Sequence, residues 1–323
     1  MAECAVCYVA DENFLLPSLV AATALRRAVA PDRADIFLFV VDGDAAVTAA
    51  LERFLAGDAI HVLPLTSREF TGFDPGDFNK THVPPATLGR FFMEGALPLS
   101  CRRILYIDGD TWLAGDPSPL IDAEIPDGRL LAAEDISSFY QHEPAWYGEE
   151  ARSYLRRLGV PARQGYANAG VFAVTRATWR QIGDEAYRFF RENAALCRHH
   201  DQSALNAVIG DRRLRLSVRW NFQTPYRLLG VERQIAPRLY HFTWAAKPWA
   251  SKAGPWKRFH APYQRALRPF APLRLPISRA SPRAMARHEL DYVKQTVKLR
   301  TLARPLLAER RARLAAYESE AWL

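Results

Sequence analysis

The stretch ILYIDGDT at residues 104–111 is a short apolar run that ends in two carboxylates two positions apart. An apolar run of this length is typical of a buried strand. In extended backbone, side chains two positions apart project to the same side, so the carboxylates of Asp108 and Asp110 would lie close together. Their repulsion is costly unless a cation lies between them. The stretch therefore predicts a buried strand with an oxygen-rich site for a divalent ion at its carboxyl end.

Strand-like and helix-like segments alternate on both sides of this stretch. Apolar runs predict strands at 4–10, 35–41, 60–65, 103–107, 130–133, 171–174 and 239–242. Helical spacing of apolar residues predicts helices at 16–30, 45–55, 87–97 and 177–196. This alternation predicts an α/β fold in which helices cover both faces of a parallel or mixed sheet.

The composition is that of an ordinary globular protein. The chain has 323 residues, of which 49% are hydrophobic and 24% charged, so a mostly disordered or fibrous architecture is excluded. The N-terminal stretch lacks the basic segment and the apolar run of a secretory signal. The longest apolar runs are far shorter than the roughly 20 residues of a membrane-spanning helix. We therefore expect a cytoplasmic protein.

Ligands of open α/β sheets bind beyond the carboxyl ends of the strands. Asp11 follows the first expected strand, and Asp108 and Asp110 follow the fourth. The sequence contains neither a G-x-G-x-x-G motif nor a P-loop, which argues against the ordinary dinucleotide-binding and NTPase sites.

Four further segments stand in order along the chain. They are YVADENF at 8–14, NAGV at 168–171, DQSALN at 201–206 and HFTWAAKPW at 241–249. Together with Asp108-Gly109-Asp110, they resemble the family 8 glycosyltransferases, which are retaining enzymes that include lipopolysaccharide galactosyl- and glucosyltransferases and glycogenin. The resemblance runs from about Cys4 to Trp249. It implies a GT-A fold, a single Rossmann-like nucleotide-binding domain with a mixed sheet, and the use of a UDP-sugar with Mn²⁺.

The resemblance also implies a metal site. Asp108, Asp110 and His241 would be the protein ligands of the metal, and Lys247 would contact the diphosphate. This is chemically reasonable, because an imidazole beside two carboxylates shifts the preference from Mg²⁺ toward Mn²⁺. A lysine can neutralise phosphate as a point charge.

The other implied contacts divide between the nucleotide and the donor sugar. Nucleotide contacts are implied for Ala10, Asp11, Asn13, Phe14, Asp108 and Lys247. Donor-sugar contacts are implied for Arg90, Asp135, Asn168, Ala169, Asp201 and Gln202. Asp11 would contact the uracil edge, and Phe14 would stack where the family often has Tyr.

Gln202 and Asp201 are the implied catalytic residues. Gln202 matches the residue near the reacting face of the anomeric carbon, and a glutamine is a poor nucleophile, unlike the carboxylate of a retaining glycosidase. We therefore favour a front-face mechanism, and a covalent intermediate on Asp201 is the alternative. Trp244 stands where the family usually has Gly, and Ser203 stands where many members have an acid.

Residues 261–323 carry the excess positive charge. This segment has thirteen Lys and Arg against five acids, which equals the net charge of +8 for the whole chain. Leu290, Val293 and Val297 fall at helical spacing, and 306–317 could form a second basic helix. Such a segment suits an anionic membrane surface; the alternative is a solvated helix packed on the main domain, or a flexible end. We divide the chain into a GT-A domain, 1–260, and a basic tail, 261–323.

We predict a retaining transferase that moves a hexose, with glucose or galactose favoured, from a UDP-sugar to an acceptor hydroxyl. The acceptor would belong to a lipopolysaccharide, a capsule or another glycolipid. The tail suggests peripheral attachment to the inner face of the membrane, and nucleic acid is not an expected partner.

Three other functions stay open. The chain could be a catalytically silent membrane-surface or scaffold protein on a GT-A fold. It could be a sugar-nucleotide pyrophosphorylase-like enzyme, although such an enzyme should have a Gly-rich, basic loop, and residues 10–14 contain no Gly, Lys or Arg. Within the same family, it could also be a self-glucosylating, glycogenin-like protein.

Overall fold

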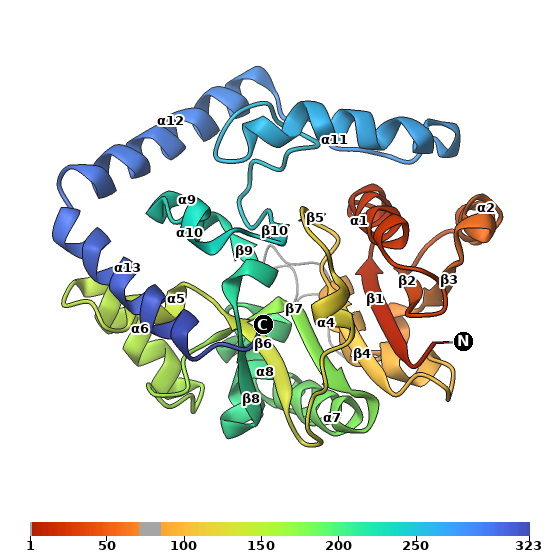
Figure 1. The fold of residues 1–323 in the computed structure, drawn as a ribbon, viewed down its shortest axis with the longest axis horizontal. Coiled ribbons are helices and arrows are strands. Elements are labelled where there is room, and N and C mark those ends of the chain that lie inside the picture. Colours follow the sequence, from red (N-terminus) through yellow and green to blue (C-terminus); the bar gives the residue numbers. More distant parts are fainter. Residues whose placement is uncertain (1, 71–84) are drawn as a thin grey trace.

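The computed structural model describes residues 2–70 and 85–323, and a seven-stranded sheet forms its centre (Figure 1). The strands of this sheet are β1 (Cys4–Ala10), β2 (Asp35–Val41), β3 (Ile60–Leu65), β4 (Arg103–Ile107), β6 (Leu130–Glu134), β7 (Ala167–Thr175) and β8 (Arg213–Leu216). Their order is β3-β2-β1-β4-β7-β6-β8. A second sheet has the order β5-β10-β9 and consists of β5 (Thr111–Leu113), β10 (Leu239–His241) and β9 (Phe222–Gln223).

The large sheet is mixed, as predicted. Strand β1 pairs parallel with β2 and β4, and β2 pairs parallel with β3. Strand β7 is antiparallel to both β4 and β6, and β8 is parallel to β6. The first four strands have the predicted bounds. For β1, β2 and β4 the reason is that an apolar run buried on both faces is a clear signal in the sequence, whereas β3 has exposed positions at His61 and Pro64. Strand β7 begins at Ala167 rather than at 171, because Asn168 and Gly170 interrupt the apolar pattern without ending the strand.

Helices cover both faces of the sheet. The α-helices are α1 (Leu15–Ala28), α2 (Ala45–Leu55), α4 (Ser118–Ile121), α5 (Ser137–Tyr140), α6 (Trp146–Arg157), α7 (Arg176–Asn193), α8 (His200–Ile209), α9 (Thr224–Leu229), α10 (Glu232–Ile235), α11 (His260–Leu267), α12 (Pro282–Arg300) and α13 (Arg304–Ser319). One core cluster joins the sheet to α1, α2, α9, α11 and α13. The other joins its opposite face to α7 and α8.

The prediction of one helix at 87–97 is wrong. The chain there forms two short 3-10 helices, η3 (Pro85–Phe91) and η4 (Met93–Ala96). Glycines at 89 and 95 lower the helix propensity of the segment. A Cβ atom at Gly89 would lie 3.0 Å from Val9 Cγ1, so the tight turn also lets the backbone approach β1 closely. Similarly, α7 ends at Asn193, and the last residues of the predicted helix form η5 (Ala194–Leu196).

Helix α13 is part of the core. Its side chains Leu307, Leu314 and Tyr317 are buried in the cluster that covers one face of the sheet. Tyr317 Oη donates to the carbonyl oxygen of Leu216 at 2.7 Å and accepts from the backbone N–H of Glu134 at 3.1 Å. This part of the tail therefore packs tightly on the main domain.

The residues after α13 extend the sheet at its β8 edge. The N–H of Trp322 donates to the carbonyl oxygen of Arg215 at 2.7 Å. The N–H of Ser217 donates to the carbonyl oxygen of Trp322 at 3.0 Å. The last residues thus form a short parallel bridge with the end of β8.

Helix α12 differs from α13, although both are basic. It runs along the outside of the molecule, next to α9 and α13 (Figure 1). None of residues 282–300, all of which the structure describes, is buried. Glu289 ties the helix to the main domain by accepting from Lys257 Nζ at 2.5 Å and from the N–H of Gly254 at 2.7 Å. Among residues 2–70 and 85–323, no helix has the length and apolar character that would let it span a bilayer.

Candidate active site

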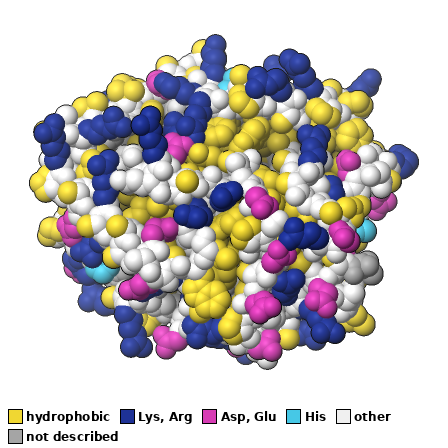
Figure 2. All heavy atoms as spheres, viewed as in Figure 1, with side chains coloured by type: hydrophobic (Ala, Val, Ile, Leu, Met, Phe, Trp, Pro, Cys, Tyr) yellow, Lys and Arg dark blue, Asp and Glu magenta, His cyan; other side chains and the backbone are white. Residues whose placement is uncertain are grey.

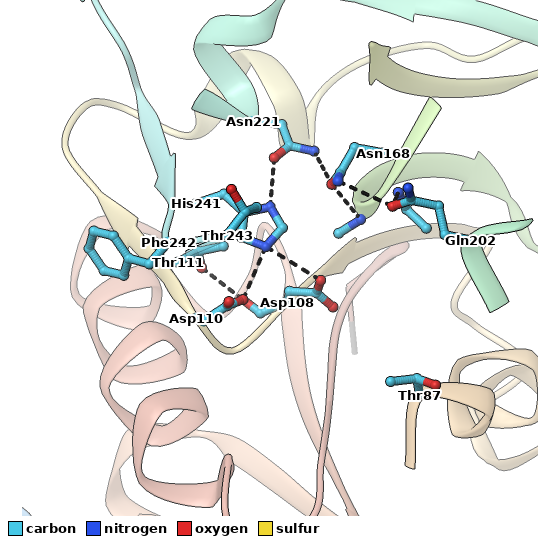
Figure 3. Close-up of polar contacts among 12 residues, drawn as sticks. Thr87, Asp108, Asp110, Thr111, Asn168, Gln202, Asn221, His241, Phe242 and Thr243 are labelled. Atoms are coloured by element: carbon cyan, nitrogen blue, oxygen red, sulfur yellow. Dashed lines mark hydrogen bonds and ion pairs between the residues drawn. The ribbon is translucent and has the colours of Figure 1, made fainter. Parts of the chain in front are cut away.

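The pairing of two short strands brings the D-x-D segment next to the segment around His241. Strand β5 directly follows Asp110, and it pairs antiparallel with β10 so that Thr111 stands opposite His241. The N–H of Phe242 donates to the carbonyl oxygen of Asp110 at 2.9 Å, which extends the pairing by one step. Residues more than 130 positions apart in the sequence therefore meet at the carboxyl end of β4 (Figure 3).

Asp108, Asp110 and His241 form a compact set of ligand atoms. One atom from each of the three side chains lies within 4.8 Å of the others. His241 Nε2 is 3.1 Å from Asp110 Oδ1 and 3.6 Å from Asp108 Oδ2. The neighbouring strand permits this approach only because residue 170 is glycine. A Cβ atom there would lie 2.3 Å from His241 Cε1 and 2.6 Å from Asp108 Oδ2.

Positive groups of the chain itself balance the Asp110 carboxylate. Lys247 Nζ donates to Asp110 Oδ2 at 2.7 Å and to the carbonyl oxygen of Phe242 at 2.5 Å. Burial alone would raise the pKa of Asp110, but Lys247 and His241 together lower it below its usual value. Burial opposes the charged form of His241, yet Asp110 and Asp108 raise the pKa of the imidazole. The carboxylates of Asp108 and Asp110 thus favour positive charge between them and His241.

These residues fit a divalent ion. Two carboxylates and one imidazole supply hard oxygen ligands and one nitrogen ligand, a set that can hold a divalent ion. The raised pKa of His241 and the cation on Asp110 indicate that the surroundings attract positive charge even without a metal.

Arg90 joins the D-x-D segment to the next group of side chains. The guanidinium is buried and lies 3.1 Å from both Asp108 Oδ1 and Asp201 Oδ2. It also donates to the carbonyl oxygen of Ala169 at 2.6 Å. Its carbon Cζ lies 4.4 Å from the centre of the Tyr106 ring. Arg90 is therefore a fixed part of the site.

A cavity of about 290 Å³ opens beside the D-x-D segment. The residues that line it are Val9, Asp11, Phe14, Ala86, Thr87, Arg90, Tyr106, Asp108, Gly109 and Asp110. It lies beyond the carboxyl ends of β1 and β4, where an open α/β sheet binds its ligands. The bottom of the D-x-D turn is close-packed, because a Cβ atom at Gly109 would lie 1.9 Å from Ser18 Oγ.

The four residues expected to hold the nucleoside lie at the end of β1 and in the turn that follows it. Ala10 is buried and ends the strand, whereas Asn13 is exposed. Asp11 Oδ1 accepts from the N–H groups of Asn13 at 3.0 Å and Phe14 at 3.1 Å, so this oxygen fixes the turn itself. Phe14 is half-buried, and its ring meets that of Trp249 edge to face at 6.0 Å. Phe14 therefore both packs on the core and lines the cavity.

Asp135, Asn168 and Gln202, three of the residues expected around the donor sugar, form one hydrogen-bonded group, and Figure 3 shows the contact between Asn168 and Gln202. Asn168 Nδ2 donates to Asp135 Oδ2 at 3.0 Å and to Gln202 Oε1 at 3.2 Å. The same Gln202 oxygen accepts from the N–H of Ala169 at 3.1 Å. Asp135 Oδ1 accepts from the N–H of Ser137, which starts α5. The side chains of Asp135, Asn168 and Gln202 thus hold each other in position.

Asp201 is buried at the start of α8. Burial raises the pKa of its carboxyl to about 6, although the adjacent Arg90 lowers it. The preceding residue, His200, is buried and has a φ of 45°, a left-handed conformation that is unusual for a residue other than glycine. This turn directs Asp201 toward Arg90 and Gln202 toward Asn168.

Besides Phe14, two residues depart from the family pattern, and they lie in different surroundings. Ser203 Oγ faces away from the sugar group and contacts Tyr154 Oη at 2.6 Å and Tyr166 Oη at 3.1 Å in a buried cluster. Trp244 is half-buried and packs against the core cluster that includes α1.

Sequence reasoning missed three residues of this site. Tyr106 Oη donates to Asp108 Oδ1 at 2.8 Å, and its place two residues before Asp108 on the strand could have indicated this. Asn221 contacts His241, and the only signal was one amide between two aromatic residues. The need for glycine at 170 arises from contacts that no local pattern shows.

Comparison with known proteins agrees with this geometry. The family described as Glycosyl transferase family 8 matches residues 5–253. General stress protein A of Bacillus subtilis (strain 168) is 32% identical over 168 residues, which are 47% of this chain and 54% of that protein. Lipopolysaccharide glucosyltransferase WaaO of Escherichia coli (strain K12) is 25% identical over 226 residues, which are 62% of this chain and 60% of that protein. The matches thus span less than two thirds of both relatives.

The fold is also that of a solved structure. The galactosyltransferase LgtC, in complex with donor and acceptor sugar analogs, superposes with a TM-score of 0.64 at 21% sequence identity. The match covers 81% of this chain and 95% of that chain. The predicted GT-A fold is therefore confirmed.

Proposed function

The chain belongs to glycosyltransferase family 8, and from this premise we propose that it is a retaining enzyme that transfers a hexose from a UDP-sugar to an acceptor hydroxyl. Glucose and galactose are the favoured hexoses. The observation that carries the proposal is the cluster of Asp108, Asp110 and His241 beside Lys247, at the mouth of a cavity that Phe14 and Arg90 help to line.

Asp108, Asp110 and His241 would hold the divalent ion, with Mn²⁺ favoured over Mg²⁺ because of the imidazole. When bound, the ion would supply Lewis-acid stabilisation of the negative charge on the diphosphate.

The chain's own groups would bind and orient the donor. Phe14 offers an aromatic face, and Asp11 offers its second carboxylate oxygen, toward the nucleoside. Lys247 Nζ pairs with Asp110 in this structure. When a metal binds Asp110 instead, this ammonium group would neutralise the diphosphate as a point charge. Asp135, Asn168, Asp201 and Gln202, with the backbone of Ala169, would hold the hexose hydroxyls, and Arg90 would fix this group relative to Asp108.

Two contacts support a front-face mechanism. Gln202 Oε1 is held by Asn168 Nδ2 and the N–H of Ala169, which suits a neutral group placed beside an oxocarbenium-like centre. Asp201 Oδ2 is engaged by Arg90 Nε at 3.1 Å, which lowers its availability as a nucleophile. The bond from the anomeric carbon to the UDP oxygen breaks, the acceptor oxygen bonds to that carbon on the same face, and the acceptor proton passes to a phosphate oxygen.

Helix α12 supports a lipid-linked acceptor. Leu290, Val293 and Val297 are 52%, 45% and 52% exposed, so the three apolar side chains identified in the sequence face outward. The basic residues of this helix are Arg283, Arg287, Lys294, Lys298 and Arg300. Figure 2 shows Lys and Arg side chains gathered on this part of the surface. An apolar stripe flanked by positive charge matches an anionic membrane surface. We place the enzyme at the inner face of a membrane, with lipopolysaccharide, capsule or another glycolipid as the acceptor.

The test is UDP release from a panel of UDP-sugars, with Mn²⁺ and with chelator. We expect release from one donor that requires the metal. Asp110→Asn should lower it at least 100-fold, since it removes a charged ligand and the partner of Lys247. Asp116→Asn, which changes an exposed carboxylate further along the same segment, is the matched control.

Three further measurements distinguish the alternatives. A silent scaffold would neither release UDP nor bind UDP with Mn²⁺. A pyrophosphorylase-like enzyme would form UTP from a UDP-sugar and pyrophosphate. A self-glucosylating protein would gain the mass of whole hexose units when incubated with donor alone. Any of these results would contradict the proposed transfer to a separate acceptor.

A further inference from the structure

Asn221 lies between the candidate metal site and the sugar-binding group, and no role was predicted for it from the sequence. It is fully buried between Trp220, which ends η7 (Val218–Trp220), and Phe222, which begins β9. We propose that Asn221 is a positioning residue that holds His241 in its Nδ1–H tautomer and couples it to Asn168. That this tautomer serves metal binding rests on the proposed function. The assignment of the tautomer depends only on the hydrogen bonds.

A backbone N–H group fixes the direction of the first hydrogen bond, and the directions of the other two follow from it. The N–H of Gly170 can only donate, and it contacts Asn168 Oδ1 at 3.0 Å. The amide of Asn168 is thereby oriented, since its other end donates to Asp135 Oδ2 at 3.0 Å. The first link thus places an acceptor oxygen toward Asn221.

The second link orients Asn221. Its Nδ2 donates to Asn168 Oδ1 at 2.9 Å, and both groups are buried. If the Asn221 amide were rotated, two carbonyl oxygens would face each other at that distance without a proton between them, which is costly away from water. Asn221 Oδ1 therefore faces His241.

The third link sets the tautomer of His241. Asn221 Oδ1 lies 2.8 Å from His241 Nδ1, and a carbonyl oxygen can only accept. Nδ1 must carry the proton, so in the neutral ring Nε2 carries a lone pair. That lone pair points between Asp110 Oδ1 at 3.1 Å and Asp108 Oδ2 at 3.6 Å (Figure 3). Three acceptor atoms converge on one point, which is the arrangement that a cation requires.

The same relay connects two functions of the site. Asn168 also contacts Gln202 Oε1 at 3.2 Å, so the orientation of Asn221 influences both the imidazole and the residues of the sugar group. Outer partners that orient a ligating histidine typically change metal affinity or activity 10–100-fold when they are substituted.

Three variants separate these effects. Asn221→Leu removes both hydrogen bonds. Asn221→Asp keeps an acceptor for His241 Nδ1 but cannot donate to Asn168 Oδ1. Gln223→Leu removes a different buried amide, which donates to the carbonyl oxygen of Glu134 at 3.1 Å, and serves as the control for a structural effect.

The first readout is the tautomer. In metal-free protein labelled with ¹⁵N-histidine, at alkaline pH, we expect the Nδ1–H form for His241, assigned by its loss in His241→Gln. Asn221→Leu should shift the ring toward a tautomer mixture, whereas Asn221→Asp and Gln223→Leu should keep the Nδ1–H form. An Nε2–H form in the wild type, or an unchanged tautomer in Asn221→Leu, would overturn the proposal.

The second readout is Mn²⁺ binding in the presence of UDP, followed by the electron paramagnetic resonance signal of free Mn²⁺. Asn221→Leu should weaken binding about 10–100-fold. Asn221→Asp should retain binding but raise KM for the UDP-sugar, because only the link to Asn168 is lost. Equal weakening by Asn221→Leu and Gln223→Leu would contradict a specific role. If the wild type shows the Nδ1–H form yet binds no Mn²⁺ with UDP, the proposed function fails while the assignment of the tautomer stands.

Discussion

Asp110 and Lys247 form an ion pair whose side chains are 10% and 20% exposed, whereas Lys294 and Lys298 on α12 point into solvent. The first pair lies in a cluster where every charge has a partner within hydrogen-bond distance. Buried charges interact strongly, since water and salt screen them little. Exposed charges are screened by salt, with a Debye length of about 8–10 Å at ordinary ionic strength. They therefore attract a charged partner together rather than through single contacts. Lysine thus serves two purposes: in the buried cluster it forms part of a binding site, and on α12 it contributes to a positive surface potential.

This difference leads to the largest predicted effect. Lys247→Met should lower the rate of UDP release about 100–1000-fold, because one preorganised cation at the developing diphosphate charge is lost. Binding of Mn²⁺ alone should not weaken, since Lys247 occupies Asp110 Oδ2 in the metal-free site. Steady-state kinetics and a metal titration measure the two quantities. Lys252→Met, at an exposed lysine nearby, is the control, and an equal loss in both variants would argue against a role specific to Lys247.

Burial of Asp201 should make stability depend on pH. Burial raises the pKa of this carboxyl from 3.8 to about 6 in the folded protein. The folded state therefore binds the proton more tightly than the unfolded state, and the resulting stability is present below pH 3.8 and lost as the pH rises through 6. Asp201→Asn should gain about 2 kcal/mol of stability relative to wild type between pH 4 and pH 8.

Thermal unfolding of both proteins at the two pH values measures this gain. The exposed Asp211→Asn is the control and should change Tm alike at both pH values, since its side chain is 88% exposed. A constant difference in Tm between Asp201→Asn and wild type would show that the carboxyl is not perturbed.

The surface of α12 can be tested without disturbing the core. Changing Leu290, Val293 and Val297 together to Ser should weaken binding to vesicles that contain an anionic phospholipid about tenfold or more, because the apolar stripe is lost. Cosedimentation with vesicles measures this, and added salt should weaken binding by the wild type while leaving Mn²⁺ affinity nearly unchanged. The Tm should stay the same.

Leu99→Ser is the matched control for the vesicle experiment. Leu99 is 90% exposed and precedes β4, at the end of the sheet opposite the candidate active site. Vesicle binding by the α12 triple variant at the wild-type level would remove the membrane role of this helix. Such point changes are cleaner than deletion of 261–323, because that deletion would also remove the buried Tyr317 of α13.

The smallest predicted effect concerns the attachment of α12 to the main domain. Lys257 and Glu289 form a half-exposed ion pair, and such pairs contribute about 0.2–1 kcal/mol. Glu289→Gln should therefore lower the free energy of unfolding by less than about 1 kcal/mol. Chemical denaturation measures it. A loss of several kcal/mol would mean that α12 belongs to the core, like α13.

The sequence predicted best what depends on local pattern. Strands β1, β2 and β4 are buried on both faces, and β3 alternates buried with more exposed positions, so their bounds were evident. The D-x-D segment, His241 and Lys247 were found through motifs whose order along the chain resembles that of a known family. What failed depends on distant contacts. The packing of η3 requires Gly89 to approach Val9, and the role of Asn221 requires β9 and β7 to be neighbours of His241.

Helices α12 and α13 show the same limit. Both are basic and carry apolar residues at helical spacing. Helix α12 is held by the half-exposed pair of Lys257 and Glu289, whereas α13 has buried partners: Glu143 pairs with its Arg310 at 2.7 Å, and Leu216 accepts from its Tyr317. Those buried partners come from regions of the chain more than 100 residues away, and no property of the helix itself indicates them.

The bridge between Trp322 and β8 has a consequence for how the protein behaves in concentrated solution. An unpaired edge strand offers its free N–H and C=O groups to other molecules and promotes aggregation. Here the last residues of the chain satisfy these groups at Arg215 and Ser217, and Leu323 accepts from Trp220 Nε1 at 3.1 Å. The final residues therefore reduce the chance that another molecule pairs with β8. A tag that pulls them from β8 would expose its edge and promote aggregation.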